Sequence, residues 1–184
     1  MTIFKTKYTP DQIAEHLYFL CIMDKEANSS IQSYKENYEI EQIDPNVETE
    51  LRFHIYALKL FTCIYAFTLW SGDAQKKDEI LVSFSKIIRA SMMIRPNNDS
   101  IWESVNNEIA TYQNTITGKT SDWDELIFAI GKCFAISMGK SDFNFSQNKI
   151  SSSSTRDTIV LMTIGSNVFM KFFLSIKKWL DKIK

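Results

Sequence analysis

The residue pair in this chain best suited to acid–base chemistry is Glu50 and His54. A spacing of four residues places both side chains on one face of a helix, opposite Arg52 and Lys59. We therefore expect Glu50 and His54 to point into the core. A buried carboxylate beside an imidazole is a general acid–base pair, part of a metal site, or a polar contact that stabilises the core. We favour the stabilising contact, because buried polar groups are normally paired.

An alternative interpretation makes Glu50 and His54 part of an internal ligand pocket, together with His16 and Tyr65. A dinuclear metal site does not fit, because such sites take Glu-x-x-His from two helices and this chain has two histidines, neither in that spacing. A mononuclear site made by both histidines with Asp24 or Glu50 is a further alternative. Our prediction is that the chain uses no metal and no cofactor.

Other catalytic motifs are incomplete. The tripeptides Gly-Lys-Thr at 118–120 and Gly-Lys-Ser at 139–141 resemble the end of a phosphate-binding loop, but the glycines that such a loop needs upstream are missing. Cys21, Cys63 and Cys133 are widely spaced within apolar runs, which indicates buried thiols in a reducing compartment and not a disulfide or zinc framework. The sequence therefore favours a protein that is not an enzyme.

Two segments are candidate interaction surfaces. Phe143 and Phe145 lie in a polar stretch at 140–153, which we expect to be a mobile loop, and exposed aromatic side chains are favoured anchors at interfaces. Lys171, Lys178 and Lys182 fall on one flank of the last predicted helix. Lysines in this position normally solvate an amphipathic helix, and peripheral contact with a membrane surface is the alternative.

The composition is that of a soluble helical domain. The chain has 184 residues, of which 45% are hydrophobic and 23% charged. Glycine and proline are scarce, which disfavours a fold of many short strands and tight turns. The net charge of −1 gives no global attraction to nucleic acid. The polar N-terminus is not typical of a signal peptide, and we expect a cytoplasmic location.

Hydrophobic periodicity predicts the elements that must position these residues. A nearly all-apolar stretch from Leu51 to Trp70 is typical of a central core helix, with Glu48, Arg52, Lys59 and Thr62 facing water. The charged residues within it argue against a transmembrane segment. A polar connection at 27–44 has room for one short amphipathic helix at most. We predict helices at about 10–26, 45–70, 73–94, 98–112, 121–139 and 154–183.

These observations predict an all-α fold in which residues 1–184 form a single-domain bundle of five or six helices. The function we expect is a non-catalytic protein-interaction or regulatory module that binds a partner protein or a second copy of itself. Its support is the lack of a complete catalytic motif together with the aromatic residues of the predicted loop. The alternative is a helical protein that binds a small ligand near Glu50 and His54.

Overall fold

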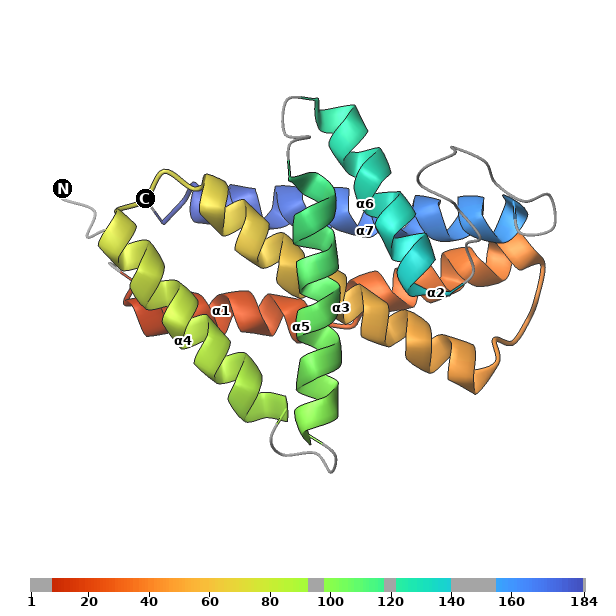
Figure 1. The fold of residues 1–184 in the computed structure, drawn as a ribbon, viewed down its shortest axis with the longest axis horizontal. Coiled ribbons are helices and arrows are strands. Elements are labelled where there is room, and N and C mark those ends of the chain that lie inside the picture. The colour runs from red at the N-terminus through yellow and green to blue at the C-terminus, as the bar shows by residue number, and fades with distance from the viewer. Residues whose placement is uncertain (1–7, 93–97, 118–121, 140–154, 184) are drawn as a thin grey trace, which may run out of the picture.

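The computed structural model describes residues 8–92, 98–117, 122–139 and 155–183 (Figure 1). All regular structure in these ranges is helical, so the predicted all-α fold is confirmed. The described ranges form seven helices, one more than the upper number expected from the sequence. They are α1 (Pro10–Ile22), α2 (Lys25–Tyr38), α3 (Pro45–Leu69), α4 (Ala74–Met92), α5 (Asn98–Ile116), α6 (Trp123–Ser137) and α7 (Thr155–Leu180).

The additional helix is α2, which occupies most of the stretch at 27–44 that the sequence presented as a polar connection. The helix predicted at 10–26 ends at Ile22, and α2 begins three residues later. Only Ala27, Ser30 and Ile31 of α2 are buried, which explains its weak apolar signal. At its far end the Tyr38 hydroxyl donates a hydrogen bond to the Asp157 carboxylate of α7. Tertiary contacts therefore hold a helix whose own sequence is mostly polar.

Side-chain caps fix the beginnings of several helices. Thr9 and Gln12 form the capping box predicted for α1, with each side chain accepting a backbone hydrogen bond from the other residue. Asp44 caps α3 immediately before Pro45, where its carboxylate accepts hydrogen bonds from the backbone N–H groups of Asn46 and Val47. Asp122 caps α6, one residue after the predicted cap at position 121, which lies outside the described residues. At the start of each of these helices, a polar side chain accepts hydrogen bonds from backbone N–H groups that have no partner within the helix.

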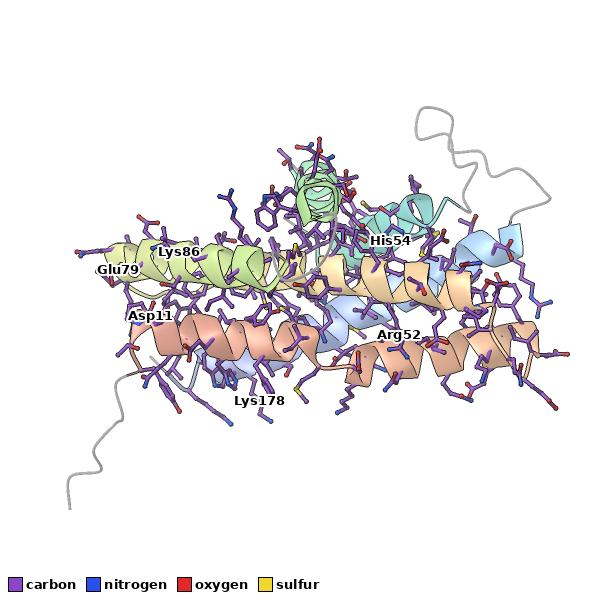
Figure 2. All side chains as sticks on the ribbon, turned by 90° about the horizontal axis from the view of Figure 1, so that it is seen from below. Asp11, Arg52, His54, Glu79, Lys86 and Lys178 are labelled. Atoms are coloured by element: carbon purple, nitrogen blue, oxygen red, sulfur yellow. The ribbon has the colours of Figure 1, made fainter. Side chains whose placement is uncertain are left out.

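Helix α3 is the central element of the fold, as predicted. It packs against α1, α2, α5, α6 and α7, and its middle and C-terminal parts are buried. In Figure 2, α1 and α2 lie nearly end to end in one layer, α3 and α4 lie above them, and α5 crosses on the outer side. Helix α7 runs the length of the molecule and packs against α2, α3 and α6. The buried apolar side chains of the seven helices join in one continuous core.

Helix α7 also has a composition that fits a membrane. Its segment Arg156–Leu180 is the one stretch among the described residues long and apolar enough to cross a bilayer. Half of its most apolar window is buried inside the protein. Core helices of soluble proteins pass the same test of length and composition, so the segment is weak evidence for a membrane span.

Helices α6 and α7 approach each other closely at two glycines, Gly131 and Gly165. A Cβ atom at Gly131 would lie 2.6 Å from the carbonyl oxygen of Met162, and one at Gly165 would lie 2.5 Å from Cβ of Phe134. The sequence predicted that another backbone passes close to Gly131, and this is confirmed. The absence of side chains at these positions lets the two helices pack at short range.

The substitution Gly131→Ala tests this close packing. We expect it to lower the free energy of unfolding by about 1–3 kcal/mol, because the new methyl group meets a backbone carbonyl that cannot turn away. Helix propensity alone predicts the opposite, a gain of about 1 kcal/mol. Urea denaturation measures the change, with Ser175→Ala on the exposed face of α7 as the control. A stabilised Gly131→Ala protein would show that the helices are not in tight contact.

Candidate functional site

The predicted pair of Glu50 and His54 does not form. Glu50 is exposed, so the expectation that it points inward is wrong. His54 lies on the side of α3 that faces α5 and α6 (Figure 2), and its Nδ1–H donates to Oε2 of Glu108 at 2.8 Å. Glu50 is exposed because the buried face of α3 is rotated from the one we expected. This face includes Lys59 and excludes Glu50.

Glu108 is the residue that sequence reasoning missed as the partner of His54. It is a buried carboxylate on α5, and its second oxygen accepts a hydrogen bond from the Tyr112 hydroxyl at 3.3 Å. Burial, followed by the Glu108 charge, raises the pKa of Tyr112, so the phenol stays protonated and keeps its role as a donor. The rings of Phe53 and Phe134 each lie nearly perpendicular to the imidazole ring. The cluster is a paired polar contact within the core, as favoured from the sequence, but with a different carboxylate.

His16 and Tyr65 make their ring contacts with residues other than His54 and Glu108, although Tyr65 lies on the same helix as His54. The His16 ring stacks on Trp179 of α7 with 4.2 Å between ring centroids, and burial lowers its pKa. Tyr65 packs among Phe61, Phe169 and Phe173, and burial raises its pKa. The structure therefore does not bring the predicted ligand residues His16, Glu50, His54 and Tyr65 together into one pocket.

The predicted interaction residues are only partly described. Phe143 and Phe145 lie outside the described residues. Lys171, Lys178 and Lys182 are exposed, and Figure 2 shows Lys178 pointing outward below α1. Among the described residues, no three His, Cys, Asp or Glu side chains gather closely enough to hold a metal ion.

Lys59 is buried, although the sequence analysis placed it on a face exposed to water. Its Nζ donates to the carbonyl oxygen of Met23 at 2.7 Å and to Oε2 of Glu26 at 2.9 Å. The same ammonium lies 4.8 Å from the centroid of the Phe172 ring on α7. Met23 is the C-cap of α1, where a cation also interacts favourably with the helix dipole. Thr62 is buried as well, with its hydroxyl bonded to the Leu58 carbonyl.

A pocket of about 490 Å³ opens where α1 ends and α2 begins. Its walls come from the α1–α2 junction, α3, the end of α4, and α5. The size is within the range of small-molecule sites, roughly 300 to 1,000 Å³. Most of its lining is apolar: Tyr18, Cys21, Ile22, Met23, Ala27, Phe53, Ile55, Tyr56, Met92, Ile101 and Val105.

The polar side chains of the pocket wall already have partners in the protein. Arg52 bonds Glu48 at 2.8 Å and Asn28 at 3.0 Å, and it lies 3.6 Å from the Asp24 carboxylate. Figure 2 shows Arg52 on the side of α3 toward α2, opposite His54. The Lys59 ammonium bonds the Met23 carbonyl and the Glu26 carboxylate. Two hydroxyl groups, those of Thr49 and Ser91, each donate to a carbonyl of their own helix. The wall is therefore an apolar surface with neutralised charges.

Sequence reasoning missed this pocket for identifiable reasons. The break between α1 and α2 carries no proline or glycine, the residues that usually mark such a point. The one available signal was a lysine with apolar neighbours on both sides, in the stretch Ala57 to Phe61. A lysine there must either reach water or find a carboxylate within the core.

His54→Leu tests whether the His54 and Glu108 pair is structural. We expect a loss of about 1–3 kcal/mol in the free energy of unfolding, because the buried Glu108 carboxylate loses a hydrogen-bond donor. The double variant His54→Leu with Glu108→Leu is expected to recover most of that loss. Denaturation in urea measures both variants. Strictly additive losses would contradict the pairing.

We compared the chain with models of protein families, with curated proteins and with solved structures, and no match was found in any of the three comparisons.

Proposed function

We propose that this protein is a small-ligand-binding protein whose pocket at the α1–α2 junction takes an uncharged, largely apolar molecule. The observation that carries the proposal is a cavity of about 490 Å³ with a mostly apolar lining. Pockets of this size and character bury most of the surface of a small ligand, and burial of apolar surface supplies the binding free energy. Ligand binding was the alternative function drawn from the sequence, with a site near Glu50 and His54. The pocket at the α1–α2 junction lies on the other side of α3 from His54.

The charge state of the ligand follows from the paired groups on the wall. Lys59 faces Glu26, and Arg52 faces Glu48 and Asp24, so both cations already have carboxylate partners. An anionic ligand would lose its hydration without gaining an unpaired cation, which is costly. A neutral molecule avoids that cost. The hydroxyl of an alcohol can still share a hydrogen bond with groups at the rim.

The protein-interaction function expected from the sequence is a second candidate. It is favoured by the exposed apolar side chains of Phe19, Ile22 and Met23 at the end of α1, two of which also line the pocket. In that case an apolar side chain of a partner protein or a second copy would enter the same pocket. Contiguous exposed apolar residues are typical of such surfaces. Self-association measured by sedimentation would favour this candidate.

A blocked pocket tests the proposed function. Thr49 is exposed on α3 at the pocket, and Thr49→Trp places a large ring over the opening without disturbing the core. The matched control is Thr163→Trp on α7. Thr163 is also exposed and also bonds the carbonyl four residues earlier, yet it is not among the residues that line the pocket.

Titration calorimetry with decan-1-ol, and separately with decanoate at pH 8, gives the readout. We expect decan-1-ol to bind the unmodified protein and Thr163→Trp equally, and to bind Thr49→Trp at least about tenfold more weakly, a difference of about 1.4 kcal/mol. Decanoate should bind the unmodified protein at least about tenfold more weakly than the alcohol does. Failure of both probes to bind would contradict the ligand-binding function. Preferential binding of decanoate would contradict only the uncharged ligand.

A further inference from the structure

Two of the three cysteines lie in contact between α1 and α3. Cys21 is in the last turn of α1 and Cys63 is in the second half of α3, and their sulfur atoms are 3.3 Å apart. Both side chains are buried. Cys133 is on α6 and belongs to the environment of Tyr112 and Glu108 instead. The three thiols are buried, as the apolar runs around them predicted, but the spacing of the cysteines in the sequence did not indicate that Cys21 and Cys63 meet.

We propose that Cys21 and Cys63 form a redox-active dithiol that a small hydroperoxide converts into an intramolecular disulfide. A disulfide requires two sulfur atoms about 2.05 Å apart, so the pair must approach by little more than roughly 1 Å. The two residues belong to helices that already pack against each other.

Cys21 is the thiol that an oxidant reaches first. It lines the pocket at the α1–α2 junction, whereas Cys63 is not part of the pocket wall and is fully buried. Cys63 has Lys59 one helical turn away, and its sulfur lies 4.0 Å from the Leu17 carbonyl oxygen. Burial, followed by the contact with Cys21, raises the pKa of Cys63, so this residue is a thiol at neutral pH. The arrangement therefore places one sulfur on the pocket wall and a second, resolving sulfur behind it.

The reaction has two balanced steps. The Cys21 sulfur attacks one oxygen of hydrogen peroxide, the O–O bond breaks, and the products are a sulfenic acid on Cys21 and one water molecule. The Cys63 sulfur then attacks the Cys21 sulfur. The S–O bond breaks, the leaving hydroxide takes the Cys63 proton, and a second water molecule is released. The two thiols lose two electrons in total, and the peroxide gains them.

The disulfide would tie the end of α1 to α3 beside the Lys59 contact. It closes a loop from Cys21 to Cys63 that contains all of α2, so it restricts the unfolded chain over that whole stretch. The thermal midpoint of the oxidised protein is expected to rise by roughly 5 to 15 °C. The rise should disappear when a reductant restores the thiols.

The experiment treats the unmodified full chain with hydrogen peroxide and then counts free thiols after unfolding. We expect the count to fall from three to one, with a peptide cross-link between Cys21 and Cys63 in the mass spectrum. Because this mapping uses the unmodified chain, it does not depend on whether a variant folds. A cross-link that includes Cys133, a link between two chains, or oxidised Cys21 without any cross-link would overturn the proposal.

Two variants give matched controls. Cys133→Ala should form the same cross-link at the same rate, because its sulfur takes no part in the reaction. Cys63→Ala should accumulate a sulfenic acid on Cys21 that a dimedone-type reagent traps. Trapping on Cys133 instead, or a thermal midpoint that falls on oxidation of the unmodified chain, would show that the two sulfur atoms are not arranged for bond formation.

Discussion

Lys59 carries a positive charge into the centre of the protein, and a buried ammonium group must find its partners there because water is excluded. It finds a carbonyl at the end of α1, a carboxylate at the start of α2, and the face of an aromatic ring on α7. One side chain from the central helix therefore contacts three other helices. The break between α1 and α2 lies at the point where this contact is made.

The pocket and the cysteine pair both lie next to that contact. Helix α1 ends at Ile22, and α2 starts at Lys25, so the chain leaves one helix and enters another over a very short distance. A cavity opens at this break because neither helix covers it fully. Cys21 lies one residue before the end of α1, and Cys63 lies one turn after Lys59. The local geometry that creates room for a ligand also brings the two thiols together.

Much of the fold follows from the sequence, because caps and apolar periodicity are local signals. The capping box at Thr9 and Gln12, the start of α3 at Pro45, and the close packing at Gly131 were all predicted from nearby residues. Helix α2 was underestimated because tertiary contacts, such as the Tyr38 and Asp157 hydrogen bond, supply its stability. Local patterns contain no information about such contacts.

The candidate site was less predictable for the same physical reason. The spacing of Glu50 and His54 suggested a pair within one helix, but the partner of His54 is Glu108, which is 54 residues away. Lys59 was assigned to water because lysine normally is exposed, yet its partner Glu26 is 33 residues earlier. A charged residue in an apolar run indicates that a partner exists. It does not indicate which residue that partner is.

The most direct test of the central role of Lys59 is a double-mutant cycle with Glu26, using the free energy of unfolding in urea for Lys59→Met, Glu26→Gln and the double variant. The account predicts that Glu26→Gln alone costs about 3–5 kcal/mol, since it leaves the buried ammonium without its carboxylate, and that adding Lys59→Met recovers part of this loss. The coupling free energy should exceed about 1.5 kcal/mol. Losses that add to within about 0.5 kcal/mol would contradict the account and show that Lys59 does not hold the α1–α2 junction through Glu26.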